Sequence, residues 1–318
     1  MENILLIRLK SIGDVLFTLP AVHAVRQHFP TAKITFLTSK GNAPMLRGFR
    51  DVDEVITLDR DATKTPLRAP PEIFKLLRRL RAENFSLAVD FQGYGETAWL
   101  SWLSGAPERF GNVYSAGREW LYTRGVRHNK QIHQADWNLS LLEQCGLRSA
   151  EIRNEFFLPA DAIAAARIFF SENRLSEKNP TLFIQAFTSS PQKDWPLKNY
   201  LALARHFQSR GVQIIFGGGP AEIQKLEPAR AAGFIVSAGL PLMTSAGLVK
   251  LSTLTVGGDT GLLHLAVAMG RRVLMLMSAV GRTHPFQHAD WTITPANKKN
   301  ISEIQIEKVI ESAGNVFC

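Results

Sequence analysis

The sequence predicts an α/β protein with two doubly wound domains, and three observations carry this prediction. Short runs rich in Ile, Val and Leu alternate with helical patterns, which is typical of a mostly parallel sheet with crossover helices. The alternation stops near a polar stretch that ends at Pro180 and then starts again. The 318 residues exceed the length at which a single core usually stops growing. We therefore expect an N-terminal domain over residues 1–172 and a C-terminal domain over residues 173–318.

The apolar runs give the expected strands of each domain. They cover residues 4–9, 34–38, 55–58 and 87–91 in the first domain, and 182–187, 212–216, 234–236, 254–256 and 273–277 in the second. An amphipathic stretch at 304–310 predicts a last surface helix. Doubly wound sheets bind ligands beyond the carboxyl ends of their strands, so we expect the chemistry in the residues that follow each run, facing a cleft between the domains.

Composition indicates a globular cytoplasmic protein. Hydrophobic residues make up 45% of the chain and charged residues 20%, which suits substantial cores. Arg8 and Lys10 interrupt the first apolar run, so it fails as a signal peptide, and no later stretch approaches the ~20 apolar residues of a membrane span. Cys145 and Cys318 give neither a disulfide framework nor metal-ligand spacing.

The net charge of +9 points to an anionic partner, which charge alone does not identify as nucleic acid, acidic lipid or phosphorylated substrate. Basic residues concentrate at 75–81 and 118–130. The first cluster has apolar residues at helical spacing, so we interpret it as the solvated face of an amphipathic helix. A membrane-binding patch is compatible with that interpretation.

The first loop of interest is SIGDVLFTLP, residues 11–20, directly after the first expected strand. Gly13 supplies backbone freedom, and Asp14 begins a helix that Pro20 should kink. In one interpretation, Asp14 is a helix N-cap that accepts backbone N–H bonds. In the other, its carboxylate lies at the carboxyl edge of the first sheet and acts as a general base.

The second loop, FTSSPQKDWP, follows the first strand of the second domain and carries hydroxyls at Thr188, Ser189 and Ser190 and an ammonium group at Lys193. Hydroxyl donors with one lysine suit phosphate oxygens. The alternative is a polar surface turn whose Trp195 packs at the start of the next helix.

The third loop, GGGPAE, lets the backbone approach a ligand through three glycines and places Glu222 in the first turn of a helix. Glu222 is positioned like the acidic residue that holds ribose hydroxyls in nucleotide-binding folds, although the GxGxxG fingerprint of NAD proteins is absent. The alternative is a carboxylate that only complements the helix dipole.

The fourth loop, GGDTGLLHLAVAMG, is the strongest single signal in the chain. Asp259 or Thr260 caps a helix here, Gly261 follows, and His264 lies about one turn later. Helix N-termini bind phosphate through free N–H groups, and His264 is placed to reach the same ligand. The alternative for His264 is a buried histidine with structural hydrogen bonds.

Met243, in the segment PLMTS, follows the strand expected at 234–236. It is a candidate for lining an adenine pocket, with ordinary core packing as the alternative. Two D-x-D strings, at 51–53 and 59–61, match the pattern of metal-dependent glycosyltransferases, but they bracket one short strand, so we interpret them as solvated turns.

RLKSIGDVLFTLPA, KDWP, GGGPAE and GGDTGLLHLAVAMG, in that order, resemble glycosyltransferase family 9, the lipopolysaccharide heptosyltransferases. The resemblance runs from Ile4 to about Pro285. It implies a GT-B fold of two Rossmann-like domains facing a central cleft, and inverting transfer without a metal ion or other cofactor. The implied donor is ADP-heptose and the implied acceptor is a lipid-linked inner-core sugar. It further implies a cytoplasmic enzyme in peripheral contact with the inner membrane, with no nucleic-acid partner.

The same resemblance assigns roles by motif position. Asp14 matches the catalytic base and Lys193 the lysine that contacts the donor phosphates. The remaining matches are the hydroxyl pair Thr188 and Ser189, the ribose-binding Glu222, the nucleoside contact Met243, and the diphosphate and sugar loop of Asp259, Thr260, Gly261 and His264.

The chain departs from the family pattern at two places near the donor. Gln185-Ala186-Phe187 stands where the family commonly has His or Cys followed by small residues, and Ser278-Ala279-Val280 replaces a Gly-Pro turn. Two rival functions stay open from sequence: a nucleotide-sugar epimerase of the same fold, and a non-catalytic module that binds nucleic acid or another anion. A non-catalytic module would have no functional role for the Asp14 carboxylate.

Overall fold

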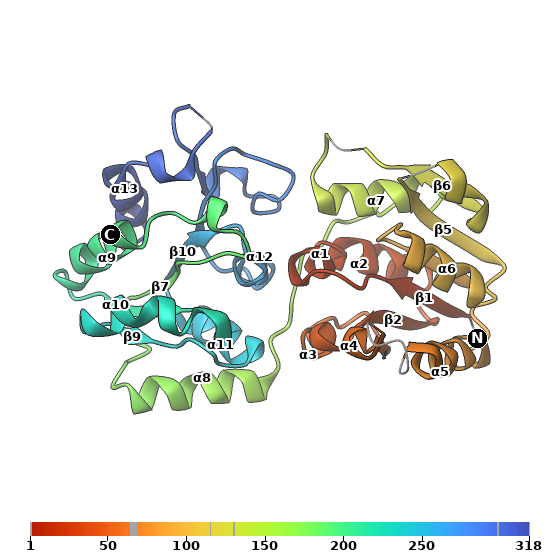
Figure 1. The fold of residues 1–318 in the computed structure, drawn as a ribbon, viewed down its shortest axis with the longest axis horizontal. Coiled ribbons are helices and arrows are strands. Elements are labelled where there is room, and N and C mark those ends of the chain that lie inside the picture. The colour runs from red at the N-terminus through yellow and green to blue at the C-terminus, as the bar shows by residue number, and fades with distance from the viewer. Residues whose placement is uncertain (1, 64–68, 115, 130, 298, 318) are drawn as a thin grey trace. The chain divides into compact units, whose positions relative to one another are not determined.

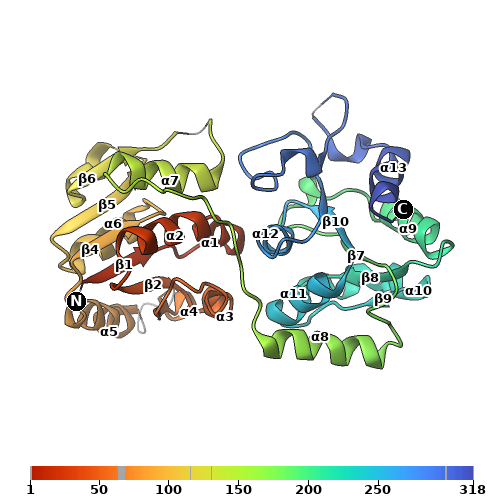
Figure 2. The same cartoon turned by 180° about the vertical axis from the view of Figure 1, so that it is seen from behind.

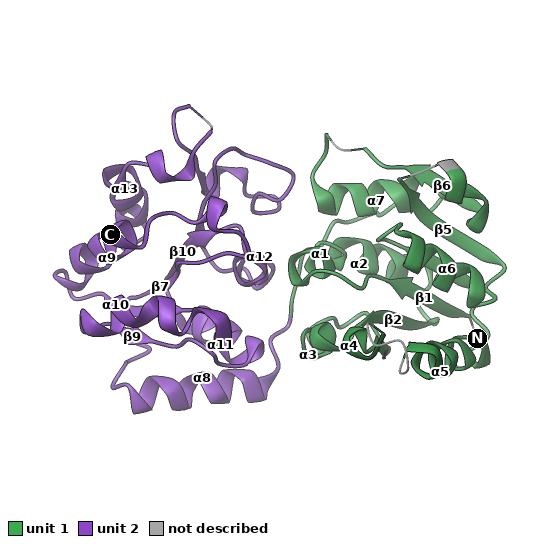
Figure 3. Cartoon of the chain, viewed as in Figure 1, with its two compact units in different colours: residues 1–156 green, residues 157–318 purple. Residues whose placement is uncertain are grey.

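The computed structural model describes residues 2–63, 69–114, 116–129, 131–297 and 299–317. The chain divides into two compact units, unit 1 (Met1–Phe156) and unit 2 (Phe157–Cys318), as Figure 3 shows by colour. Each unit has its own parallel six-stranded sheet with helices on both faces. The predicted pair of doubly wound α/β domains is therefore confirmed.

The sheet of unit 1 has the strand order β3-β2-β1-β4-β5-β6, and every neighbouring pair is parallel. The strands are β1 (Asn3–Ile7), β2 (Lys33–Ser39), β3 (Glu54–Leu58), β4 (Leu87–Asp90), β5 (Glu108–Val113) and β6 (Arg124–Arg127). In the central strand, Ile4 pairs with Ile34 on one side and Leu87 on the other. After Asn3, β1 is a continuous buried apolar run, as expected for a strand whose sheet is covered by helices on both faces.

The helices of unit 1 form two layers. They are α1 (Ile12–Leu16), α2 (Leu19–His28), α3 (Ala43–Leu46), α4 (Arg60–Thr63), α5 (Ala69–Ala82), α6 (Gly95–Leu103) and α7 (Gln134–Gln144), with 3₁₀ turns η1 (Lys40–Asn42) and η2 (Ala116–Leu121). α2 packs beside α7, and α5 packs beside α6. Right-handed crossovers place these two pairs on opposite faces of the sheet.

The helix expected after Gly13 is broken rather than kinked. α1 ends at Leu16, the Thr18 hydroxyl bonds the Val15 carbonyl oxygen at 2.7 Å, and Pro20 lies in the first turn of α2. A proline fits a first turn without cost because the amide it lacks has no partner within the helix there.

The sheet of unit 2 has the order β12-β11-β10-β7-β8-β9, which read in reverse repeats the topology of unit 1. Its strands are β7 (Thr181–Gln185), β8 (Gln213–Gly217), β9 (Ile235–Val236), β10 (Leu254–Gly258), β11 (Val273–Leu276) and β12 (Thr292–Ile293). β7 thus corresponds to β1, and β10 corresponds to β4. The carboxyl ends of β10, β7, β8 and β9 follow one another along a single edge.

The helices of unit 2 also form two layers. They are α8 (Ala160–Glu172), α9 (Leu197–Gln208), α10 (Glu227–Ala231), α11 (Leu242–Leu251), α12 (Gly261–Ala268) and α13 (Ile306–Phe317), with 3₁₀ turns η3 (Pro191–Lys193), η4 (Pro220–Glu222), η5 (Gln224–Leu226), η6 (Ala289–Trp291) and η7 (Ile301–Glu303). α11 packs between α8 and α12, while α13 packs against α9 (Figures 1 and 2). None of the helices in the described ranges has the length and apolar character needed to cross a bilayer.

The sequence did not predict β5, β6 and β12. β5 reads ERFGNV and β6 reads RGVR, so neither contains the apolar run by which strands were recognised. β12 has only two residues.

The two units divide at Phe156 and Phe157, earlier than the boundary at 172 and 173 expected from sequence. α8, assigned from sequence to the first domain, packs on α11 so closely that a Cβ at Gly247 would lie 2.5 Å from the Ala162 carbonyl oxygen. The polar stretch that ends at Pro180 therefore joins α8 to β7 within unit 2. Phe156 belongs to unit 1, where its ring lies edge-on to that of Phe49.

The C-terminal helix α13 completes the core of unit 2. Val309 and Ala313 are fully buried in the core cluster, and the Phe317 ring lies 5.1 Å from that of Phe207 in α9. Just before the helix, the Ile304 carbonyl oxygen accepts a hydrogen bond from Trp195 Nε1 at 3.0 Å. The amphipathic pattern predicted a surface helix but did not indicate that it packs against α9.

Candidate active site

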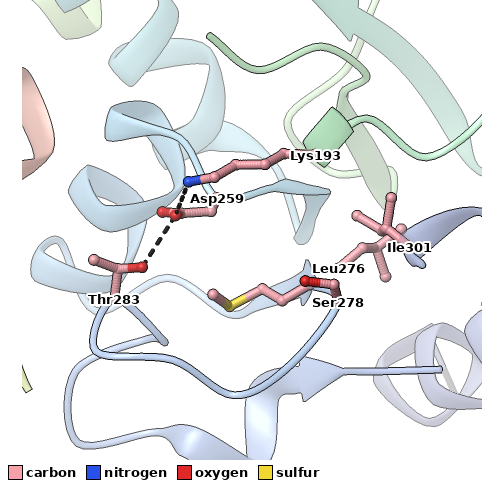
Figure 4. A pocket seen from close by; sticks show the side chains of 7 residues that line it. Lys193, Asp259, Leu276, Ser278, Thr283 and Ile301 are labelled. Atoms are coloured by element: carbon pink, nitrogen blue, oxygen red, sulfur yellow. Dashed lines mark hydrogen bonds and ion pairs between the residues drawn. The ribbon is translucent and has the colours of Figure 1, made fainter. Parts of the chain in front are cut away.

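Asp259 is the centre of a polar cluster in unit 2. It follows β10 directly, at the carboxyl edge of the sheet. Its Oδ2 accepts a hydrogen bond from the Thr283 hydroxyl at 3.0 Å and pairs with Lys193 Nζ at 3.1 Å, as Figure 4 shows. Its Oδ1 lies 2.9 Å from His264 Nε2. Segments far apart in the sequence thus converge on one carboxylate.

The surroundings of Asp259 hold it ionised. Burial by itself raises the pKa of this carboxyl group, but the hydrogen bond from His264 and the charge of Lys193 outweigh burial and lower its pKa to about 2. Lys193 keeps 57% of its side chain exposed while it pairs with Asp259. Its ammonium group has three donors, so it can bind a ligand anion without leaving the carboxylate.

A pocket of about 110 Å³ opens beside this cluster. Its lining residues are Lys193, Asp259, Leu276, Met277, Ser278, Thr283 and Ile301 (Figure 4). In Figure 4, Lys193, Asp259 and Thr283 lie together on one side, and Leu276 and Ile301 lie across from them beside Ser278, a mixed lining that suits a charged group attached to a less polar one. The volume holds a few water molecules or one phosphoryl group, not a whole nucleotide sugar.

Gly258 allows the second and fourth sequence motifs to meet. A Cβ at this position would lie 2.5 Å from Thr188 Cγ2 and 3.2 Å from the Lys193 carbonyl oxygen. The loop after β7 therefore packs directly on the end of β10. The sequence placed both loops at the carboxyl edge of the sheet, and they meet because β7 and β10 are neighbouring parallel strands.

α12 presents its N-terminus next to Asp259. Thr260 is the N-cap, and its hydroxyl accepts a 3.4 Å hydrogen bond from the Leu263 amide. Gly261 begins the helix, and His264 is 4% exposed in its first turns. His264 is thus buried, as its structural alternative predicted, and its ring also touches the site carboxylate. The two interpretations of this histidine are compatible.

Thr188 and Ser189 differ in their surroundings. Thr188 is buried, and its hydroxyl donates to the Ser190 carbonyl oxygen at 2.9 Å. Its amide donates to Asp194 Oδ1 at 2.7 Å, which closes the turn that carries Lys193. Ser189 is exposed. Thr188 therefore shapes the loop, whereas the Ser189 hydroxyl faces solvent.

Glu222 and Met243 follow the next two strands along the same edge, β8 and β9. Glu222 lies in η4, and its Oε2 accepts a hydrogen bond from the Gly219 amide at 2.5 Å. Met243 is buried in the first turn of α11. Neither residue lines the pocket beside Lys193. The two residues lie instead on the opposite side of β7 from Asp259.

In unit 1, Asp14 is held by the end of β1. Its Oδ2 accepts hydrogen bonds from the Ser11 amide at 3.1 Å and the Ser11 hydroxyl at 3.3 Å, and it pairs with Arg8 Nη2 at 2.9 Å. Ser11 is the N-cap of α1, so Asp14 occupies the third helical position and not the cap itself. About a third of the Asp14 side chain is exposed.

Arg8 was missed from sequence as a partner of Asp14. It is nearly buried, with Nη1 donating to the Phe91 carbonyl oxygen and Nε to that of Lys10, both at 2.8 Å. These bonds leave Nη2 aimed at Asp14. The signal in the sequence that could have identified Arg8 was its position directly after an apolar run, where a strand ends.

A second missed network supports the same loop. Asp90, the last residue of β4, is fully buried and accepts hydrogen bonds from the Gln92 and Gly93 amides and, at 2.7 Å, from the Tyr122 hydroxyl. Burial raises the pKa of Asp90. Gln92 Oε1 in turn accepts from the amides of Leu9 and Lys10. The network fixes the chain that leads to Asp14.

The D-x-D strings take part in local structural contacts. Asp51 lies 2.8 Å from His23 Nδ1, while Asp53 pairs with Arg26 and accepts from the Ile34 amide. Asp59 caps α4 through the amides of Asp61 and Ala62. Within the described ranges, no group of three or more His, Cys, Asp or Glu side chains is arranged to hold a metal ion.

Comparisons with known proteins identify the fold and the family. The chain is 23% identical to the lipopolysaccharide core heptosyltransferase OpsX of Haemophilus influenzae, over 97% of this chain and 95% of that protein. The solved glycosyl transferase family 9 structure from Veillonella parvula superposes with a TM-score of 0.89 at 21% identity, covering 99% of this chain and 97% of that one. E. coli heptosyltransferase WaaC, solved with ADP-2-deoxy-2-fluoro heptose, gives 0.78 at 21% identity, covering 98% and 99%. The two units thus form the predicted GT-B fold.

The sequence model of Glycosyltransferase family 9 (heptosyltransferase) matches residues 73–311, a range that includes the loops of Lys193, Glu222 and Asp259. This match covers more than half of the chain. It also decides between the transferase and its two rivals. The protein belongs to glycosyltransferase family 9.

Proposed function

We propose that this enzyme transfers a heptose from ADP-heptose to a lipid-linked inner-core sugar of lipopolysaccharide. The observation that carries the proposal is the convergence of Lys193, His264 and Thr283 on Asp259 beside a small pocket at the N-terminus of α12. Such a site suits the diphosphate and sugar of an activated donor. The relatives described above supply the identity of the sugar.

The donor would lie along the carboxyl edge of the sheet in unit 2. Lys193 and the first amides of α12 would bind the diphosphate at the β7 and β10 ends. The nucleoside would extend toward β8 and β9, where Glu222 would accept hydrogen bonds from the ribose hydroxyls and Met243 would contact adenine. The strand order supports this layout, since the four loops follow one another along one edge.

Asp14 would serve as the general base for the acceptor. Its carboxylate takes the proton of the attacking hydroxyl while the oxygen forms a bond to the anomeric carbon of heptose. Attack from the face opposite ADP breaks the bond to the β-phosphate oxygen and inverts the anomeric configuration. ADP leaves with the bonding electron pair.

Lys193 and the α12 amides would stabilise the charge that develops on departing ADP, so that no metal ion is required. Transfer would take place in the cytoplasm, at the inner membrane face where a lipid-linked acceptor is presented. The anionic partner that the basic charge suggested is then a phosphorylated substrate and a lipid surface rather than nucleic acid.

Four measurements on the full chain test the proposal. A screen of nucleotide sugars by thermal melting should give the largest stabilisation with ADP-heptose, ~2.7 kcal/mol at one hundred times its dissociation constant. Calorimetry should rank ADP above UDP and GDP, and product analysis by NMR should show inverted configuration. Transfer should persist in excess EDTA. Equal affinity for the three nucleotides would remove the adenine assignment, and activity that EDTA abolishes and magnesium restores would overturn the metal-free mechanism.

A further inference from the structure

The exposed aromatic side chains of the protein gather on one unit. Within the described ranges, the large hydrophobic residues that unit 2 exposes are aliphatic: Ile168, Ile223 and Val280. Unit 1 exposes Phe74, Tyr94, Trp99, Trp102, Tyr114 and Trp120. Large aromatic groups usually enter the core, so a concentration of them on one surface indicates an interaction site.

Three of these residues form a single cluster of tryptophan rings. Trp99 and Trp102 lie three residues apart on α6, and Trp120 reaches them from η2. The ring centroids are separated by 5.6, 5.6 and 6.2 Å, yet each side chain stays 40% to 59% exposed. The opposite side of α6 is the one that packs on the sheet, through Ala98 and Ser101. The tryptophans are therefore held outward.

Basic residues flank this cluster on both sides. On neighbouring α5, Arg78 and Arg81 share the outward face with Phe74, at the helical spacing i, i+4 and i+7. Arg81 Nε donates to the Leu103 carbonyl oxygen at the end of α6. On the other side, the Arg118 guanidinium lies over Gly95 at the start of α6, 3.3 Å from the position of a Cβ.

α5, which carries the basic cluster at 75–81, and η2, which carries Arg118 of the second cluster, thus both pack against the one helix that bears Trp99 and Trp102; Figure 1 shows α5 and α6. Together α5 and η2 contain five Lys or Arg and two Glu. We refer to Trp99, Trp102 and Trp120 with Arg78, Arg81 and Arg118 as the tryptophan face.

We propose that the tryptophan face docks on the surface of a bilayer that contains anionic phospholipid. Tryptophan combines an apolar ring with an N–H donor and is enriched at the level of lipid headgroups. Arginines around it are attracted to anionic headgroups, and the two contributions together give stable but reversible binding. The inference deepens the proposed function, on which it rests for the source of a lipid-linked acceptor. It assigns the docking to one face of unit 1.

Vesicle co-sedimentation of the full chain tests the assignment. The wild type should bind phosphatidylcholine vesicles that contain phosphatidylglycerol, and bind pure phosphatidylcholine vesicles much less. The double variant Trp99→Gln, Trp120→Gln should lose about tenfold or more in apparent partition coefficient. The matched control, Ile168→Gln with Ile223→Gln, removes two exposed hydrophobic residues from unit 2 and should bind like the wild type.

A second pair of variants tests the charge. Arg78→Glu with Arg118→Glu should weaken binding about tenfold or more, since each basic residue contributes to attraction by an anionic surface. Lys178→Glu with Lys308→Glu makes the same change of net charge on unit 2 and should have a much smaller effect. Brominated lipids should quench wild-type fluorescence, because Trp99, Trp102 and Trp120 are exposed whereas Trp137 and Trp195 are buried.

Thermal melting and ADP affinity should stay unchanged in every variant, which excludes unfolding. Vesicle binding that the Trp99 and Trp120 changes leave intact would overturn the proposal. Two other results would also overturn it. If the wild type is a dimer that these changes convert to a monomer, the face serves self-association. If the changes abolish transfer to a water-soluble, delipidated acceptor, the face binds glycan. If the wild type docks on vesicles yet transfers no heptose, the proposed function fails and the docking surface stands.

Discussion

Asp90, the last residue of β4, and Asp259, the residue after β10, lie at the ends of corresponding strands in two sheets with the same topology, yet their environments are opposite. Asp90 is fully enclosed, and neutral donors satisfy it: two amides and the Tyr122 hydroxyl. Asp259 meets a lysine, a histidine and a threonine at the rim of a pocket. Burial raises the pKa of the first, whereas the surrounding donors and positive charge lower that of the second.

The difference shows that a carboxylate at the favoured edge of a doubly wound sheet is not by itself a ligand site. In unit 1 the chain continues from β4 into a turn that folds over Asp90, and Tyr122 passes over Gly111 to reach it. In unit 2 the chain continues from Asp259 into the N-terminus of α12, which keeps the carboxylate accessible. At the carboxyl edge of unit 1, Asp14 is a carboxylate that stays partly accessible, with Arg8 as its partner.

The largest expected effect separates Asp14 from Asp90. In Asp14→Asn the amide cannot accept the acceptor proton, so kcat should fall ~10²–10⁴. Asparagine retains an acceptor for the Ser11 amide, so melting temperature and ADP affinity should change little. Transfer is measured at saturating substrates, with Asp90→Asn as the control, which should keep its rate within about tenfold. An Asp14→Asn enzyme within a few-fold of the wild type would remove the catalytic assignment.

The next effect concerns the cation that faces Asp259. Lys193→Met removes a charge-assisted donor to the departing diphosphate and should lower kcat ~10²–10³. Lys198→Met provides a matched control, because it removes an exposed lysine from the first turn of α9. Steady-state rates and ADP calorimetry measure the two contributions. Equal rates in the two variants would mean that Lys193 serves only as the ion-pair partner of Asp259.

A smaller effect is expected at Glu222. Glu222→Gln should weaken ADP binding by ~1.5–3 kcal/mol if its carboxylate accepts the ribose hydroxyls. Calorimetry with ADP measures this loss directly. Unchanged affinity would restrict Glu222 to its observed bond with the Gly219 amide.

The smallest effect tests the two opposed pKa shifts. The folded-state pKa of Asp259, about 2, lies below the ordinary aspartate pKa of 3.8, so its stabilisation is present above pH 3.8 and is lost as the pH falls toward 2. The wild type should have a higher free energy of unfolding than Asp259→Asn, and this difference should be up to ~2 kcal/mol larger at neutral pH than near pH 2. Asp90 has a raised pKa, so the advantage of wild type over Asp90→Asn should grow as the pH falls. Denaturant unfolding measures the stability difference between the wild type and each variant across this pH range. Plotted against pH, the difference should rise for Asp259→Asn and fall for Asp90→Asn; a change in the same direction for both variants would contradict the comparison.

Sequence reasoning succeeded where neighbouring strands carry motifs at their ends. The placement of Lys193 and Asp259 at the same edge of the sheet was predictable because apolar runs reveal β7 and β10, and the structure adds that these strands are neighbours. It failed where a hydrogen-bond partner comes from a segment that has no recognisable helix or strand pattern. Thr283 lies in the irregular chain after β11, and Tyr122 reaches Asp90 only because β5 and β6, whose sequences are polar, bring it there. Ser278 was noted as a departure from the family, not as part of the pocket lining.

The surface of unit 1 shows a second reason why the sequence alone could not predict every contact. Residues 75–81 and 118–130 were recognised as two separate basic clusters, because nothing in a linear sequence places η2 beside α6. Trp99 and Trp102 also fit the pattern of a helix with two apolar sides, so the pattern does not distinguish a buried side from an exposed one.

The hydrogen bond from Trp195 to Ile304 makes the end of the chain a mechanical support for the donor site. The two residues are 109 positions apart, and Trp195 lies two residues after Lys193. A premature stop codon or a protease cut just before Ile304 would thus remove an anchor of the loop that carries the lysine, although every residue proposed for catalysis would remain. Carboxy-terminal truncation is therefore a lesion of this enzyme that an inventory of its catalytic residues would overlook, and an affinity tag is better attached at the other end of the chain.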